Sequence, residues 1–559
     1  PEAVKASGAF PTLLDPVEID GKLFVDGGVV NNFPTDIMRK KNVDLVIGID
    51  VQDKLKMKGN LDSAPTIIMQ IVNFQMYDNE QLKKSLADVY IQPDIRDYTV
   101  VSFDDKSAII KAGEDAAQKQ IEKLKEIANL QGQNRVFVID DVIRFKRNDL
   151  QIDQVNIQGT KNYTDEYVLG KLGIKKGESL SYEQFSKGIN QLSATQNFKS
   201  IQYKFTDRKS IEFKLRESDI SSFVKIGAHF DDLYKTAALL NVTSKHLLFD
   251  NDVISADLIL GDNIRYNFDY FIDNGFHWSY GIHSRFNHFD KSIFKSTFET
   301  TAETETDTKV RTKYNDFTNQ VFVQSAISNA VAIRLGAETK YLRIFTESVT
   351  NNEEIKTFYD NSTYGNVFAE LKVDTYDKAL LPKKGFILDV NYKGYVVLIN
   401  DNGITNNFTP FTQLKGALGF AYTFKDKLTA HIISEAGITI GENENKVHNF
   451  HLGGNNENFV NNFTSFYGYD VGDFSGKGYL KSALTLRYEL FKNNHLLFAA
   501  NAARAEEDII NDGRLFENTK LGYAIGYSIE SFLGPLEIKY TWSPDTSNNI
   551  WFFNLGFWF

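Results

Sequence analysis

One short pattern in the sequence has residue types and a spacing that could support chemistry. Asp26-Gly27-Gly28 follows the strand-like stretch 22–25, so a carboxylate stands at the start of a glycine-rich turn. Two glycines after an aspartate permit a tight turn with positive φ and let another backbone come close. Taken alone, the pattern is typical of a hairpin turn, and its chemical meaning depends on its surroundings.

The composition excludes several other kinds of site. The chain of 559 residues has no Cys, which rules out a disulfide, a thiolate nucleophile and a Cys-ligated zinc. Lys and Arg number 62 while Asp and Glu number 73, and the net charge of −11 argues against a broad basic face for nucleic acid. His448 and His451 have an H-x-x-H spacing, but they stand in a polar loop without evident carboxylate geometry. We therefore predict no metal, no cofactor and no nucleic-acid partner.

The elements around Asp26 are those of an α/β unit covering residues 1–130. A buried-strand pattern runs over 43–51, and apolar residues recur at helical spacing over 104–130. Asp105 or Ser107 is the expected cap of this helix. The polar stretch 131–135 is a predicted linker.

A second small unit is predicted over residues 136–218. A strand at 155–160 is followed by a short helix with Thr164 as its N-cap, and then by a turn and a second helix. Two strands, 200–205 and 210–215, close the unit. This order of elements predicts a compact α+β domain.

Over residues 221–559 the helical period gives way to alternation of apolar and polar residues. Phe386 and Leu388, for example, share one face of a predicted strand, while Asp389 and Asn391 share the other. Roughly 16 such strands can be marked, which suits a transmembrane barrel. No apolar run reaches about 18 residues, so no transmembrane helix is expected.

A soluble β-sandwich array would show the same alternation, and three features favour the barrel. The polar face carries charges, as a wet lumen would. Aromatic residues, 13% of the chain, gather at strand ends, and some connections are long and polar while others are tight. The predicted fold class is multi-domain: a partial α/β unit, an α+β domain and a 16-stranded antiparallel transmembrane β-barrel.

The stretch 6–51, which contains Asp26-Gly27-Gly28, resembles the carboxy-terminal half of the patatin-like phospholipase domain, and the resemblance covers residues 1–130. That family closes its active site with an Asp-Gly-Gly or Asp-Gly-Ala turn. The resemblance implies that Asp26 is the base of a Ser–Asp dyad, and that Gly27 and Gly28 let the turn sit against the nucleophile. A carboxylate that touches a serine oxygen can accept its proton directly. Asn31 and Asn32 either brace the turn or simply form it.

The sequence lacks the other half of such a site. No G-x-S-x-G elbow occurs, and the nearest match, at 472–478, has the wrong spacing. Because the chain opens with Pro1 and shows no signal peptide, we expect the nucleophile and the oxyanion loop to precede it, cleaved off or in a separate chain. A catalytically dead variant is the alternative. This chain alone is predicted to be inactive, with the missing amino-terminal patatin segment as its partner.

Residues 150–218 resemble a polypeptide-transport-associated (POTRA) domain within the predicted unit 136–218. Such modules are periplasmic and have exposed strand edges that can accept another strand. A single copy is either a spacer between enzyme and barrel or a client-binding module, and the sequence leaves both open.

The final part resembles the barrel of the outer-membrane assembly and two-partner-secretion superfamily, through 381–392, 450–459 and Phe466-Tyr467-Gly468-Tyr469. The last pattern is similar to the tip of that family's sixth extracellular loop, which normally carries an Arg and folds into the lumen. Tyr467 stands at the Arg position, so that residue cannot supply an Arg–carboxylate anchor. Whether the loop still folds into the lumen is a question that the sequence leaves open. Phe559, after alternating aromatics, is similar to the terminal-strand signal read by the barrel-insertion machinery.

Together the resemblances imply a Gram-negative outer-membrane protein with its patatin and POTRA parts in the periplasm. The leading hypothesis is an anchored lipid acyl hydrolase of phospholipase A type, acting on outer-membrane lipids, for which a homodimer is one allowed state. Two alternatives stay open. One is a secretion system whose barrel exports its own passenger, and the other is an assembly or translocation pore with a vestigial hydrolase.

Overall fold

The computed structural model of the protein divides into two compact units, Pro1–Ile143 and Arg144–Phe559. The structure describes residues 2–11, 14, 16–52, 67, 70–71, 80–98, 102, 105–130, 150–207, 209–298, 308–350, 353–401, 408–425, 427–442, 445–455, 462–509, 517–531, 534–546 and 549–556. The helices in this part of the chain all lack the length and hydropathy of a membrane-spanning helix.

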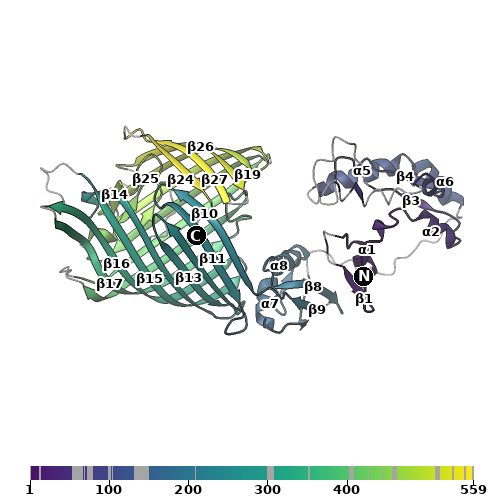
Figure 1. Ribbon diagram of the computed structural model, residues 1–559, viewed down its shortest axis with the longest axis horizontal. Coiled ribbons are helices and arrows are strands. Elements are labelled where there is room, and N and C mark those ends of the chain that lie inside the picture. Colours follow the sequence, from purple (N-terminus) through teal and green to yellow (C-terminus); the bar gives the residue numbers. More distant parts are fainter. Residues whose placement is uncertain are drawn as a thin grey trace. The chain divides into compact units, whose positions relative to one another are not determined.

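The first unit is an α/β arrangement with two separate strand pairs (Figure 1). Its elements are α1 (Glu2–Ser7), β1 (Val17–Ile19), β2 (Lys22–Phe24), η1 (Gly27–Val29), α2 (Thr35–Lys40), β3 (Ile47–Ile49), α4 (Glu80–Ser85), β4 (Val89–Ile91), α5 (Lys106–Gln118) and α6 (Ile121–Leu130). β1 and β2 form an antiparallel hairpin that leads into the Asp26 turn, whereas β3 and β4 pair in parallel.

The core of this unit lies on one face of β4. Val89 and Ile91 are buried against Ala116 of α5, and Leu124 and Ile127 of α6 pack against the same cluster. Both helices therefore hold their apolar residues against one strand, which is what the helical spacing of the sequence requires.

The single helix predicted over 104–130 is corrected by the structure, because a turn at 119–120 separates α5 from α6. Asp105 occupies the N-cap position of α5, but its side chain makes no capping hydrogen bond. Ser107 lies inside the helix. The predicted linker 131–135 lies outside the described residues.

The second unit begins with a small α+β domain. Its elements are β5 (Leu150–Gln151), β6 (Gln154–Gln158), α7 (Asp165–Leu172), β7 (Ser179–Leu180), α8 (Tyr182–Ala194), β8 (Phe198–Phe205) and β9 (Ser210–Glu217). The sheet has the order β6-β9-β8, with β6 parallel and β8 antiparallel to β9. The predicted strand–helix–helix–strand–strand order is confirmed for β6, α7, α8, β8 and β9, while the short pair β5 and β7 was not predicted.

Local sequence signals explain both helices of this domain. The hydroxyl of Thr164 accepts a hydrogen bond from the Tyr167 backbone N–H at 3.3 Å, so the predicted N-cap is confirmed. Ser181 and Gln184 form a reciprocal capping box at the start of α8. Between the helices and the sheet, Phe185 and Phe213 are buried in one apolar cluster.

The rest of the chain closes into an antiparallel barrel of 16 strands (Figure 1). The strands are β10 (Ser222–Asp231), β11 (Lys235–Lys245), β12 (Asp252–Gly261), β13 (Arg265–Ile272), β14 (Ser279–Phe294), β15 (Lys309–Ser328), β16 (Val331–Thr350), β17 (Glu353–Asp374), β18 (Gly385–Asp401), β19 (Phe411–Phe424), β20 (Leu428–Ile440), β24 (Gly478–Phe491), β25 (Asn494–Glu506), β26 (Lys520–Ser531), β27 (Gly534–Trp542) and β28 (Asn549–Leu555). Closure joins β10 to β28, which confirms the predicted barrel.

The two faces of the barrel wall explain the alternation of the sequence. On β24, the side chains of Leu484, Leu486 and Tyr488 point outward and are exposed, whereas Lys481 and Arg487 are buried on the lumen side. A soluble sandwich would bury such an apolar row. An exposed outer row is instead what a barrel surrounded by lipid requires.

The α+β domain is docked on turns at one end of the barrel. Thr164 and Asn251, in the turn after β11, exchange two hydrogen bonds of 2.9 and 2.8 Å. Lys171 of α7 forms a 2.6 Å ion pair with Asp273 in the turn after β13. A polar interface of this kind fixes the orientation of the domain against the barrel.

Candidate functional site

The Asp26 side chain is fixed by one of its two oxygens. Its Oδ1 accepts a 2.7 Å hydrogen bond from the Gly28 N–H, and its own backbone N–H donates to the Ala9 carbonyl at 2.9 Å. Asp26 thereby caps η1 from a half-buried position. Among the described residues, no group donates a hydrogen bond to Oδ2. The turn therefore presents an oriented carboxylate with one oxygen left to accept a proton.

The two glycines of the turn have different roles. Neither has a positive φ, so the turn does not use that conformational freedom of glycine. A Cβ at Gly28 would lie 2.7 Å from the Asn32 Oδ1 and 3.0 Å from the Asp26 Oδ1, whereas a Cβ at Gly27 would meet nothing within 4 Å. The crowding at Gly28 comes from side chains of the turn itself. The approach of another backbone to these glycines stays a prediction.

The asparagines connect the turn to the next helix. The Asn31 side chain donates a 3.1 Å hydrogen bond to Asp36 in the first turn of α2. This hydrogen bond lowers the pKa of the Asp36 carboxyl below its ordinary value. Asn32 lies against Gly28. Asn31 therefore ties the Asp26 turn to α2.

A second fixed carboxylate, Asp50, was not singled out from the sequence. It follows β3 directly, is buried, and accepts hydrogen bonds from the Tyr90 hydroxyl at 2.5 Å and from the Gln52 side chain at 3.1 Å. Burial and the hydrogen bond to Asp50 raise the pKa of Tyr90 to about 12. Sequence reasoning could have found Asp50, because it is an Asp at the end of the predicted buried strand. Both oxygens of Asp50 are engaged, so it braces the two parallel strands.

The motif in the barrel loop is packed rather than exposed. Phe466 and Tyr469 are buried in one cluster with Phe450 and Tyr479. The Tyr467 N–H donates a 2.8 Å hydrogen bond to Asn501 of β25. The tip is therefore held even though Tyr467 replaces the expected Arg.

The barrel wall contacts this tip from a second strand. The Lys539 Nζ on β27 lies 5.7 Å from the centre of the Tyr467 ring. Gly468 has φ of 82°, and a Cβ there would lie 2.5 Å from the Trp542 carbonyl oxygen at the end of β27. Only glycine allows this approach between loop and wall.

The segment 441–477, called the lumen loop here, contains η5 (Lys446–His448), β21 (Phe450–Leu452), β22 (Phe463–Thr464) and β23 (Phe474–Gly476). Phe463 packs against Phe289 of β14 and Tyr314 of β15, at ring-centre distances of 5.6 and 5.7 Å. Gln413 of β19 donates a 2.6 Å hydrogen bond to the His448 carbonyl oxygen. With the contacts to β25 and β27, the loop touches strands around the ring, which is geometrically feasible only inside the lumen. The entry that the sequence left open therefore occurs.

The histidines of the H-x-x-H pattern belong to this packing. Both are buried, and the His448 ring lies 5.0 Å from Tyr364, 5.1 Å from Tyr395 and 5.0 Å from Phe411, between ring centres. Within the described part of the chain, no three His, Asp or Glu side chains are grouped to hold a metal ion. Phe559, the predicted terminal-strand signal, lies outside the described residues.

A closed antiparallel barrel with an apolar outer face and a polar lumen that its own loop enters is the architecture of an outer-membrane protein. The profile of the OMP85 superfamily matches residues 209–559, and the chain belongs to that superfamily. Two further profiles match: patatin-like phospholipase over residues 1–39, and the POTRA profile, described as surface antigen variable number repeat, over residues 150–218.

Individual relatives are more distant. Lysophospholipase NTE1 of Candida glabrata is 26% identical over 148 residues, which cover 22% of this chain and 9% of that protein's length. BamA of Haemophilus ducreyi lacking POTRA domains 1–3 is 12% identical, covering 73% of this chain and 84% of that chain, with a TM-score of 0.49. CdiB of Acinetobacter baumannii is 13% identical, covering 72% and 73%, with a TM-score of 0.46.

Proposed function

We propose that the chain anchors a patatin-like lipid acyl hydrolase of phospholipase A type in the outer membrane, with Asp26 as its general base. The patatin-like profile includes Asp26-Gly27-Gly28. The observation that carries the proposal is the carboxylate itself: the Gly28 N–H fixes Oδ1, and Oδ2 accepts no hydrogen bond from the described residues. A general base needs this combination of fixed direction and an available lone pair.

The proposed reaction needs a serine that this chain does not supply in a nucleophile elbow. That serine, carried by the missing amino-terminal patatin segment, attacks the acyl carbonyl while Asp26 takes its proton. Backbone donors in the same segment stabilise the oxyanion. The tetrahedral intermediate collapses by breaking the ester C–O bond, and Asp26 passes its proton to the departing lysophospholipid oxygen. Asp26, again a carboxylate, then takes a proton from water as that water attacks the acyl-serine. The proton returns to the serine oxygen as the fatty acid leaves. The chain alone is inactive in this scheme.

Lipids are the proposed substrates because the barrel holds the hydrolase beside a bilayer. Tethering raises the effective concentration of a surface-bound substrate without any new contact. The patatin-like and POTRA-like parts are proposed to lie in the periplasm, facing the inner leaflet. The barrel-insertion machinery, reading the strand that ends at Phe559, is a further proposed partner, and a homodimer is an allowed assembly.

Replacing Asp26 in the full-length protein, upstream segment included, tests this function. Asp26→Asn keeps the size of the side chain but removes the base, so release of fatty acid from phospholipid vesicles should fall by about 10²–10⁴-fold. Asp20→Asn, in the neighbouring hairpin turn, is the matched control, since asparagine tolerates the φ of 51° found there. Equal lipid turnover by wild type and Asp26→Asn would exclude catalysis by this carboxylate.

One observation favours the translocation alternative. Among the described residues, β10 and β28 are paired only at Phe230 and Leu555, whereas β27 and β28 are paired at seven positions. Among the described residues, opening this seam would break fewer ladder hydrogen bonds than opening the neighbouring β27–β28 pair. Protease treatment of intact cells separates the functions, because digestion of the patatin-like part at the cell surface would favour export and its protection would favour the periplasmic hydrolase.

A further inference from the structure

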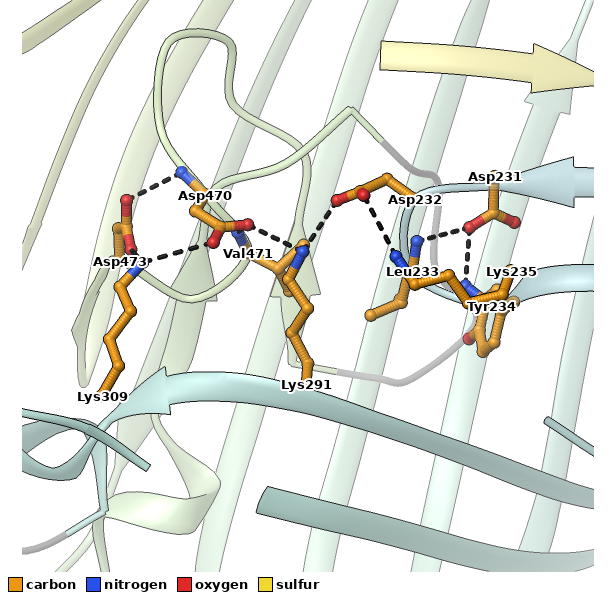
Figure 2. Close-up of polar contacts among 10 residues, drawn as sticks. All are labelled: Asp231, Asp232, Leu233, Tyr234, Lys235, Lys291, Lys309, Asp470, Val471 and Asp473. Carbon is orange, nitrogen blue, oxygen red and sulfur yellow. Dashed lines mark hydrogen bonds and ion pairs between the residues drawn. The ribbon is translucent and has the colours of Figure 1, made fainter. Parts of the chain in front are cut away.

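Two lysines of the barrel wall hold the lumen loop by its carboxylates (Figure 2). The Lys309 Nζ on β15 lies 3.2 Å from the Asp470 Oδ2 and 2.9 Å from the Asp473 Oδ1. The Lys291 Nζ on β14 lies 3.0 Å from the Asp470 Oδ1, so Asp470 is gripped through both of its oxygens.

The loop side of this contact is a rigid turn. The Asp470 N–H donates to the Asp473 Oδ2 at 2.7 Å, and the Val471 N–H donates to the Asp470 Oδ1 at 2.8 Å. Val471 is buried in the same apolar cluster as Leu233 and Tyr234. The hydrogen bonds within the turn therefore hold both carboxylates in a fixed orientation toward the lysines.

The wall side is also braced. Lys291 forms a second ion pair of 2.7 Å with Asp232 in the turn between β10 and β11. The neighbouring Asp231 holds that turn by accepting hydrogen bonds of 2.7 Å from the backbone N–H groups of Leu233 and Tyr234. Figure 2 shows the row of contacts running from Asp473 through Lys291 to this turn. The loop is thereby tied to β14, β15 and the first hairpin of the barrel.

In all of these loop–wall ion pairs the negative charge lies on the loop and the positive charge lies on the barrel wall. The loop contributes anions, Asp470 and Asp473, and the wall contributes cations, Lys291 and Lys309. At the tip, the face of the Tyr467 ring likewise meets a wall cation, Lys539. We propose that Lys291 and Lys309 form a latch, called the lysine latch below, that keeps the lumen loop in place as a plug. The proposal goes beyond the hydrolase and does not depend on it.

The burial of these groups makes the latch more than a surface contact. The side chains of Lys291 and Asp473 are 14% and 16% exposed, and that of Asp470 is 28% exposed. Partly buried ion pairs are weakly screened by salt, and separating them leaves charged groups unpaired near apolar packing. Moving the loop out of the lumen requires these three ion pairs to break in addition to the packing around Phe463, so the latch raises the barrier to opening the barrel.

The test uses Asp470→Lys in the full chain, reconstituted in planar lipid bilayers. The new cation faces Lys291 and Lys309, and we expect the open-channel probability to rise about tenfold. Because the chain has no Cys, a Ser465→Cys background adds a second readout, the rate at which a water-soluble maleimide labels the loop, which should also rise about tenfold. Arg311→Glu is the control, since it breaks the 2.8 Å ion pair with Asp290 on the same two strands without touching the loop.

Heat-modifiable gel mobility shows whether Asp470→Lys forms a folded barrel. If the folded variant keeps wild-type conductance and labelling, the proposal of a lysine latch is wrong. An equal effect of Arg311→Glu would also overturn it, because any lost ion pair on these strands would then suffice. A double-mutant cycle with less disruptive substitutions tests the ion pair between Lys309 and Asp473 directly. The double variant Lys309→Met with Asp473→Asn should raise the open-channel probability no more than Lys309→Met alone. Additive effects of the two substitutions would contradict the contact.

Discussion

The Asp26 turn and the lumen loop are both irregular segments that carry a family motif, and they are held in opposite ways. The Asp26 turn depends on a few local hydrogen bonds, and its flanking residues Leu23 and Phe24 are exposed. The lumen loop is held by packing from several sides, with Phe463 and Phe466 buried. The Asp26 turn orients a single carboxylate, whereas the lumen loop packs inside the barrel.

The difference follows from what surrounds each segment. A closed ring of strands offers the loop an inner surface on every side. In the α/β unit, Ile47 and Ile49 of β3 are paired with Val89 and Ile91 of β4. The two β4 side chains are buried, whereas the two β3 side chains are exposed. Apolar residues on a strand are usually covered. The uncovered side chains of β3 support the proposal that a further segment completes the α/β unit.

The largest effect that would sharpen the comparison concerns two phenylalanines. Phe463→Ala should lower the free energy of unfolding of the barrel by about 3 kcal/mol or more, because it leaves a cavity against Phe289 and Tyr314. Phe24→Ala, at a side chain that is 43% exposed, should cost under about 1 kcal/mol. Guanidinium unfolding in detergent micelles measures the first, and hydrogen exchange of the α/β unit measures the second. Similar costs at both positions would contradict the contrast drawn here.

A smaller effect is expected from the two glycines of the Asp26 turn. Gly28→Ala forces the Asn32 and Asp26 side chains to shift, and overpacking of this kind costs about 1–3 kcal/mol. If the shift displaces the carboxylate, lipid turnover by the full-length protein should fall about tenfold. Gly27→Ala, which meets nothing within 4 Å, should leave turnover unchanged. Equal losses in the two variants would mean that the turn has another conformation in the complete site.

The sequence predicted the barrel well because alternation along each strand is a local signal. The 16 strands and the N-cap at Thr164 follow from residues that are close in sequence. The lysine latch was missed because its partners, Lys309 with Asp470 and with Asp473, are 161 and 164 residues apart and leave no periodic trace. The role of Asp26 stays a prediction, since the residues that would touch its free oxygen are not among those described.

The smallest expected effect is a pH dependence confined to the α/β unit. Asp88 accepts 2.7 Å hydrogen bonds from the Val46 N–H and from Arg39, and these contacts lower the pKa of its carboxyl. A lowered folded-state pKa adds stability that is present above the unfolded pKa and is lost as pH falls through the folded pKa. Asp88→Asn should therefore speed hydrogen exchange of β4 at neutral pH. The difference from wild type should begin to shrink as pH falls below about 4 and should vanish once the pH is below the lowered pKa of Asp88. Asp94→Asn, at an exposed ion pair with Arg96, is the control. A difference that persists at acid pH would mean that Asp88 acts through packing and not through its charge.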